Sequence, residues 1–103
     1  MKVFLKNERK DINAIGEFDK KTRELKVLKN SKVSKDIAYS AKFRGSKSIE
    51  KQRTGRIIDC ILQEDVIFKS PSTAGNFVTG RSTNGLTAWI DKDGKTIKEV
   101  LGE

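Results

Sequence analysis

The sequence contains no histidine and only one residue each of cysteine, proline, tryptophan and tyrosine. Without histidine, the chain lacks the side chain that most often acts as a general base near neutral pH, and it lacks the commonest metal ligand. A serine or cysteine nucleophile activated by histidine is excluded for the same reason. We therefore expect a non-catalytic protein with no cofactor and no bound metal.

Long hydrophobic runs are also absent. No stretch approaches the roughly 18 apolar residues that a membrane-spanning helix requires, and residues 1–10 lack the apolar region of a signal peptide. The single Cys60 cannot form an internal disulfide, which is typical of a reducing compartment. Because isoleucines surround it in the sequence, we expect Cys60 to be an inert core residue. The sequence predicts a soluble, cytoplasmic protein that contacts neither a membrane nor a small-molecule substrate.

Positive charge is in surplus. The chain has 22 lysines and arginines against 14 aspartates and glutamates, a net charge of +8. Residues 1–63 hold 17 of the basic and 8 of the acidic residues, whereas residues 64–103 hold 5 and 6. This asymmetry predicts a positively charged face that attracts polyanions. A solvated surface that only maintains solubility remains the alternative, because 16 of the basic residues are lysines.

The length and the residue pattern predict one α+β domain over residues 1–103. Alternation of polar and apolar residues predicts strands at 2–6, 12–18, 24–28 and 66–68. The second of these includes Gly16, a candidate bulge. Clustered isoleucines and leucine predict a helix over 50–62. The expected architecture is a small antiparallel sheet or set of hairpins with about three short helices.

The strongest local signals lie in residues 68–100, and the first of them define a helix. Ser70 is a good N-cap, and Pro71 suits the first helical position, where a missing N–H has no cost. Gly80 can adopt the left-handed conformation that ends a helix. The sequence therefore predicts a short helix between these residues.

The next signals define turns. Asn84 and Gly85 are the preferred pair for a type I′ turn, which predicts a hairpin with strands at 81–83 and 86–90. Residues 91–94 then form a second turn that leads into a last short helix. The aspartates of this turn are expected to form the turn itself, because a calcium loop needs more oxygen ligands.

The run SPSTAGNFVTGRSTNGLTAW at 70–89, followed by DGKTIKEV at 93–100, resembles the signature of a small bacterial domain of unknown function. That domain is found at the C-terminal end of GIY-YIG nucleases and restriction-associated proteins. It is similar to the restriction enzyme and adenine methylase associated (RAMA) domain. The resemblance implies recognition of nucleic acid or of a modified base, and it supplies no active site.

The resemblance extends upstream and covers about residues 12–100. VLKNSKVS at 27–34 matches the strand–turn–strand segment of the family, and Arg53 followed by two isoleucines matches a second feature. Two positions depart from the family pattern. Asn30 stands where the family usually has glycine, and Leu86 stands where it usually has a second tryptophan, which weakens the case for a paired aromatic platform.

The candidate interface joins a basic segment to the predicted hairpin. Segment 42–56 is the densest in cations, and we expect it to contact phosphates. On the hairpin, Trp89 is placed to stack on a base, with Arg81 and Asn84 supplying hydrogen bonds. The alternative for Trp89 is a role as a core anchor, and the alternative for Asn84 is a role as a turn residue. The predicted nucleic-acid-binding residues are Lys42, Arg44, Lys47, Lys51, Arg53, Arg56, Lys69, Arg81, Asn84 and Trp89.

These observations favour a non-catalytic nucleic-acid-binding module, with DNA preferred over RNA. A restriction, modification or mobile-element context follows from the resemblance. The alternative is a protein-interaction or assembly module that docks a nuclease or ATPase partner. In that case the basic surface would serve only solubility.

Overall fold

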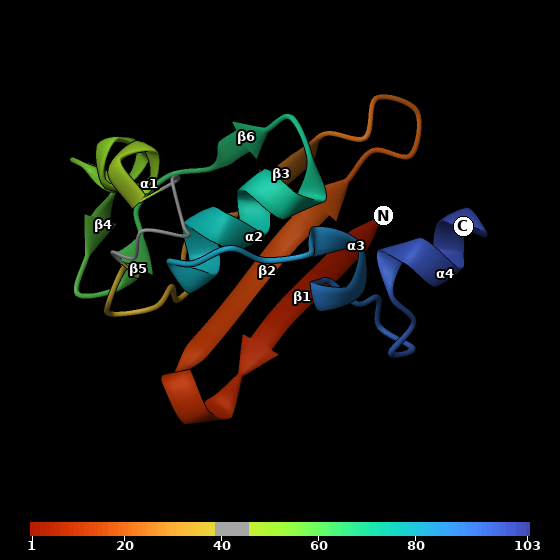
Figure 1. Cartoon of the computed structure of the whole chain (residues 1–103), viewed down its shortest axis with the longest axis horizontal. Helices are drawn as coiled ribbons and strands as arrows, with labels where there is room; N and C mark the ends of the chain where they lie inside the picture. The colour runs from red at the N-terminus through yellow and green to blue at the C-terminus, as the bar shows by residue number, and fades with distance from the viewer. Residues whose placement is uncertain (39–45) are drawn as a thin grey trace.

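The computed structural model describes residues 1–38 and 46–103 and contains two antiparallel sheets (Figure 1). The larger sheet has the strand order β1-β2-β3-β6. Its strands are β1 (Lys2–Asn7), β2 (Ile12–Phe18), β3 (Leu25–Val27) and β6 (Val66–Phe68). The smaller sheet pairs β4 (Ile57–Ile58) with β5 (Ile61–Leu62). The predicted α+β class is confirmed.

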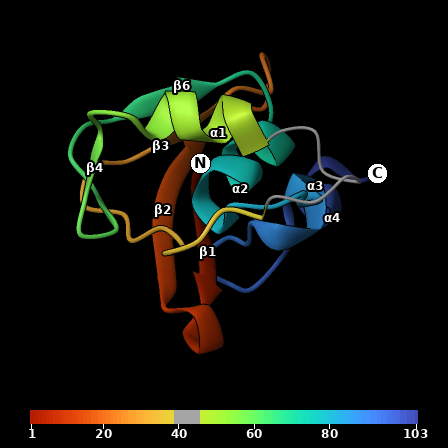
Figure 2. The same ribbon diagram turned by 60° about the vertical axis from the view of Figure 1, so that its left-hand side comes forward.

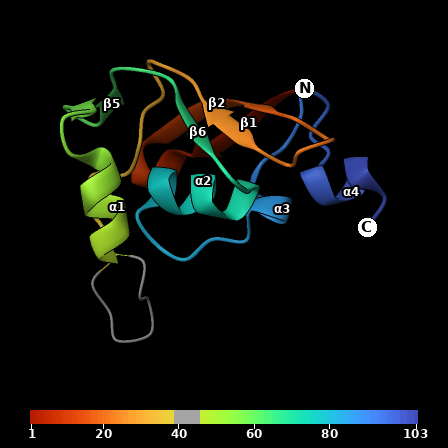
Figure 3. The same cartoon turned by 90° about the horizontal axis from the view of Figure 1, so that it is seen from above.

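The helices α2 (Pro71–Thr79) and α3 (Gly85–Ala88) lie on one side of the larger sheet. The described residues also form α1 (Ser46–Arg53), α4 (Ile97–Leu101) and a 3₁₀ turn η1 (Glu8–Lys10). Figure 2 shows η1 at the tip of the β1–β2 hairpin, and Figure 3 shows α2 and α3 against the same side of the sheet. Among these described helices, none has the length and apolar character needed to cross a bilayer.

One hydrophobic core lies between the sheet and α2. Alternate residues of each strand point to the same side of a sheet, and in this chain that side is apolar. The core includes Val3, Leu5, Ala14, Phe18, Leu25, Val27 and Phe68 from the sheet, and Ala74, Phe77 and Val78 from α2. Trp89 and Ile97 join it from the C-terminal part of the chain, and Ile12, Val33 and Leu62 also belong to it.

The predicted bulge at Gly16 is wrong, because the strand pairing continues through this residue. Gly16 lies opposite Val3 on β1 and opposite Val27 on β3. A Cβ atom at Gly16 would lie 2.8 Å from Cδ2 of Leu25 and 3.4 Å from Cζ3 of Trp89. Glycine is therefore favoured here by the close approach of the Leu25 side chain, with the Trp89 indole in ordinary contact beside it.

The helix predicted over 50–62 is also wrong. α1 ends at Arg53, and Gly55 then adopts a left-handed conformation with φ of 77°. The rest of the segment is the β4–β5 hairpin, whose two turn residues Asp59 and Cys60 have φ of 51° and 66°. Two consecutive positive φ values are typical of a type I′ turn. Cys60 is consequently half-exposed in a turn, and the prediction that it belongs to the core is wrong.

The predicted limits of α2 are confirmed. The Ser70 hydroxyl accepts a hydrogen bond from the Thr73 N–H at 3.1 Å, and Pro71 occupies the first turn. Gly80 ends the helix with φ of 74°. These features are local, which explains why the sequence predicts them.

The hairpin predicted over 81–90 is wrong, because Asn84 begins a helix. Asn84 has φ of −82°, and its side-chain oxygen accepts a hydrogen bond from the Leu86 N–H at 3.1 Å, which caps α3. Gly85 does not have a positive φ, and a Cβ atom there would overlap the backbone of Pro71. Glycine at this position thus allows α3 to pack closely against the start of α2.

The turn predicted at 91–94 is confirmed. One carboxylate oxygen of Asp91 accepts hydrogen bonds from the N–H groups of Asp93 and Lys95, both at 2.9 Å. Gly94 has φ of 82°. Thr96 then caps α4. The aspartates form this turn, as the sequence indicated.

Candidate nucleic-acid interface

α1 presents two of the predicted phosphate-binding lysines to solvent. Lys47 and Lys51 are exposed and four residues apart, so they lie on the same side of the helix. Ile49 is buried on the other side and attaches the helix to the protein. Lys42 and Arg44, the two cations predicted to precede this helix, lie outside the described residues.

Arg53 fixes α1 to α2. Its Nε and Nη2 atoms donate to the Phe77 carbonyl oxygen at 3.0 and 2.6 Å, and its Nη1 donates to the Ser34 carbonyl oxygen at 2.9 Å. Its guanidinium carbon also lies 5.8 Å from the centroid of the Phe77 ring. A cation at the C-terminal end of a helix is stabilised by the helix dipole. The structure therefore gives Arg53 a positioning role in place of the predicted phosphate contact.

Arg56 follows α1 and lies at the surface. Its Nε atom is 3.1 Å from a carboxylate oxygen of Glu64, and its Nη1 donates to the Gln52 carbonyl oxygen at 3.2 Å. An exposed ion pair of this kind contributes at most about 1 kcal/mol. Arg56 can therefore exchange the carboxylate for another anion at little cost.

The remaining predicted cations do not converge. Lys69 precedes the N-terminal end of α2 and Arg81 follows its C-terminal end, so the helix separates them. Both side chains are exposed. Asn84 is exposed as well, but its side-chain oxygen already caps α3. The structure thus does not bring these three residues into one site.

Trp89 is a core residue. Its side chain is 0% exposed, and the indole N–H donates to the Pro71 carbonyl oxygen at 3.1 Å. Since neither face of the ring is accessible, the prediction that Trp89 stacks on a base is wrong. The alternative, a core anchor, is confirmed.

The outer face of the larger sheet, which lies opposite the core, is not among the surfaces predicted from the sequence. Strand pairing and the isolated bridges at the sheet margins define three rows of side chains across this face. The first row contains Lys2, Glu17, Lys26 and Ile67. The middle row contains Ile90, Phe4, Ile15 and Leu28. The third row contains Lys6, Asn13, Lys32 and Ile61. We call these three rows the open face.

The open face combines cations with apolar side chains. Lys2 and Lys6 are exposed, and the Lys6 ammonium lies 5.3 Å from the centroid of the half-buried Phe4 ring. Ile67 is 61% exposed, although it is a large hydrophobic residue. Glu17 lies between Lys2 and Lys26 in the strand pairing. In the sequence, this surface is indicated by KVFLK at 2–6, where Lys2, Phe4 and Lys6 alternate with the core residues.

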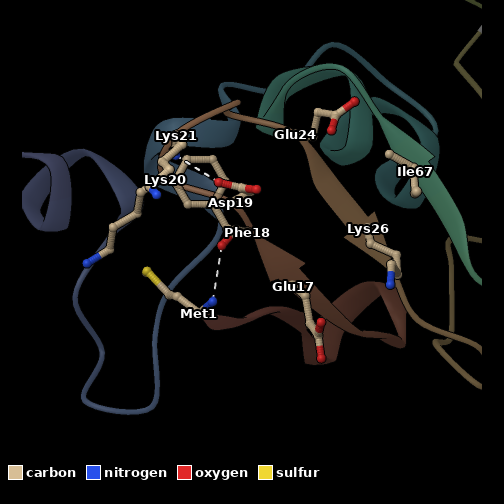
Figure 4. Close-up of a pocket in the computed structure, with 9 residues that line it drawn as sticks. All are labelled: Met1, Glu17, Phe18, Asp19, Lys20, Lys21, Glu24, Lys26 and Ile67. Carbon is tan, nitrogen blue, oxygen red and sulfur yellow. Dashed lines mark hydrogen bonds between the residues drawn. The ribbon is translucent and has the colours of Figure 1, made fainter.

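A hollow of about 780 Å³ lies at the end of the open face, beside the β2–β3 turn (Figure 4). Its charged lining residues are Glu17, Asp19, Glu24, Lys20, Lys21 and Lys26, with Met1, Phe18 and Ile67 beside them. The side chains supply three carboxylates and three ammonium groups, so they give the hollow no net preference for an anion.

Asp19 stabilises the turn beside this hollow. The N–H groups of Lys21 and Thr22 donate to one of its carboxylate oxygens at 2.8 and 3.3 Å. These backbone hydrogen bonds, that from Lys21 first, lower the pKa of Asp19 below its usual value. The carboxylate is thus a turn-forming group.

Together these features define a small α+β module with exposed lysines on α1 and on an open sheet face. In the described parts of the chain, no three potential metal-ligating side chains cluster together. The chain belongs to the family described as Domain of unknown function (DUF4357), whose model matches residues 4–101. The comparisons with curated proteins and with solved structures gave no match.

Proposed function

We propose that this chain is a non-catalytic nucleic-acid-binding module in which α1 contacts the phosphate backbone. The observation that carries the proposal is the exposed pair Lys47 and Lys51 on a helix that Arg53 fixes in place. This helix belongs to segment 42–56, in which six of seven charged residues are cations. Phosphate contacts of this type supply affinity without reading the base sequence.

The absence of histidine from the sequence supports a binding role without catalysis. The resemblance to domains of GIY-YIG nucleases and to the RAMA domain supports DNA as the ligand. On that basis we propose a restriction, modification or mobile-element context, in which this module would bring a partner enzyme to DNA.

The test is the double variant Lys47→Gln/Lys51→Gln, measured against the matched control Lys92→Gln/Lys98→Gln, which removes the same charge from exposed sites near α4. Binding to a labelled DNA duplex is followed by fluorescence anisotropy at several salt concentrations. Loss of two phosphate contacts should reduce the slope of log K against log salt by about 1.8.

The control variant should retain the wild-type slope. If both variants bind DNA more weakly by the same factor, only the total charge matters. If the α1 variant binds DNA as the wild type does, α1 is not part of the interface. Melting temperatures of both variants should match the wild type, because all four lysines are exposed.

A protein-docking module is the second candidate, and the exposed isoleucines favour it. Ile58 and Ile67 are 62% and 61% exposed, and such residues are common where a partner protein binds. The partner would be a nuclease or an ATPase. Failure of the protein to bind any nucleic acid at about 50 mM salt would favour this function over the first.

A further inference from the structure

We infer that the open face binds single-stranded nucleic acid, with bases along the middle row and phosphates beside the lysines of the outer rows. The inference rests on the proposed function and specifies the form of its ligand. It concerns a surface different from α1, formed by β1, β2, β3 and the segments that pair with them.

The geometry of the rows suits a single strand that crosses the β-strands. Residues two apart in a strand lie about 7 Å from each other on the same face, so Lys2 and Lys6 flank Phe4 at about this distance on either side. On the neighbouring strands, Lys26 and Lys32 continue the two outer rows. Lys32 also forms an ion pair with Asp11. An apolar track therefore runs between two partly cationic borders.

Phe4 supplies the stacking surface that Trp89 does not. Phe4 is half-buried, and Ile15 and Ile90 lie opposite it on the two flanking segments, where they limit the ring's movement. Bases stack on such rings irrespective of sequence, because every base has a π-face. The Lys6 ammonium lies over this ring, 5.3 Å from its centroid, and would move aside to the adjoining phosphate when a base stacks on the ring.

The chemistry favours a single strand over a duplex. In a duplex the bases stack on one another, so their faces cannot reach Phe4, and base edges are read by helices or ribbons that enter a groove. A nucleic acid also fits this surface better than a protein does. Lysine is depleted at protein–protein interfaces, whereas here lysines border the apolar row on both sides.

Glu17 provides a test in which a substitution on the open face should strengthen binding, whereas the lysine substitutions should weaken it. It is exposed and lies between Lys2 and Lys26, where its charge repels a phosphate. Glu17→Gln should therefore tighten the binding of a single strand, by about two- to fivefold at low salt. The same variant should not alter the contribution of Lys47 and Lys51 on α1.

The experiment compares one oligonucleotide as a single strand and as a duplex, for the wild type and for Phe4→Leu, Lys6→Gln, Glu17→Gln and the control Lys98→Gln. We expect the wild type to bind the single strand at least tenfold more tightly. Phe4→Leu should weaken single-strand binding roughly 5- to 150-fold and leave duplex binding unchanged. Lys6→Gln should also weaken it, and this exposed substitution does not affect the core.

Two results overturn the inference and leave the proposed function standing. One is a duplex affinity equal to or above that of the single strand. The other is that Lys6→Gln and a folded Phe4→Leu both bind the single strand with the affinity of the wild type. A wild type that binds neither form overturns the proposed function itself.

Discussion

The indole of Trp89 is the largest fully buried side chain of the described chain. It connects three distant segments, since its ring lies near Gly16 of β2 and its N–H donates to Pro71 at the start of α2. The indole therefore stabilises the attachment of the C-terminal segment to the sheet.

Trp89→Phe should lower the free energy of unfolding by about 2–4 kcal/mol. The substitution removes the indole donor to the Pro71 carbonyl and creates a cavity where the second ring was. Urea unfolding followed by circular dichroism measures the change. A variant within about 0.5 kcal/mol of the wild type would show that the indole is not the core anchor.

Asn30 illustrates how a residue with a side chain can occupy a left-handed turn position. Its φ is 76°, and its N–H donates to the Leu62 carbonyl oxygen at 2.8 Å. Asparagine tolerates the left-handed conformation better than other residues with side chains. A turn geometry that usually favours glycine is thus formed here by asparagine.

At the scale of elements, the junction between α1 and α2 depends on the planar guanidinium of Arg53. This group donates to carbonyl oxygens of Phe77 and Ser34 in two directions at once. A lysine ammonium cannot reproduce that arrangement, because it is a compact charge and lacks the planar, rigid set of N–H donors of a guanidinium group. The position of α1, and with it that of Lys47 and Lys51, follows from this contact.

Arg53→Lys should destabilise the protein by about 2 kcal/mol, which corresponds to a fall in melting temperature of roughly 8–16 °C. Arg56→Lys is the matched control, and it should change the melting temperature by less than about 4 °C because its ion pair is exposed. Equal effects of the two substitutions would contradict the positioning role of Arg53.

The β2–β3 turn should weaken in acid because of Asp19. Its pKa is lowered in the folded protein, so its contribution to stability is present above the unfolded value near 3.8 and is lost as the pH falls through the folded value. Asp19→Asn keeps the accepting oxygen but removes this titration. The stability difference between wild type and variant should shrink as the pH is lowered from 5 towards 2, and a constant difference would refute the assignment.

Elements specified by neighbouring residues are predictable from the sequence, and those that depend on distant contacts are not. Ser70 and Gly80 predict α2 because a cap needs only the adjacent turn. The sequence leaves a core role and a stacking role open for Trp89 and predicts a turn at Gly85, because the contacts that decide both are with Pro71, 14 or more residues away. The isoleucines after Arg53 are compatible with a helix and with a hairpin. The left-handed conformation of Gly55, which ends the helix, decides for the hairpin and is not evident from the sequence.

At the scale of the whole molecule, the sequence predicts the sign of the surface charge and its concentration before residue 64. It does not predict where the cations lie relative to one another, because strand register and helix docking set their positions. The lysines on α1 are exposed, as are Lys2 and Lys6 on the open face. By contrast, the Arg53 guanidinium donates to protein carbonyls. The candidate site is thus only partly predictable from the sequence.

The most direct test of the central claim, that exposed lysines bind phosphates, is the salt dependence of wild-type binding to a DNA single strand. Binding constants are measured from about 50 to 200 mM salt. Contact with at least three phosphates predicts a log–log slope of about −2 or steeper. A slope near zero, or no binding at about 50 mM salt, would contradict the claim and favour the protein-docking module.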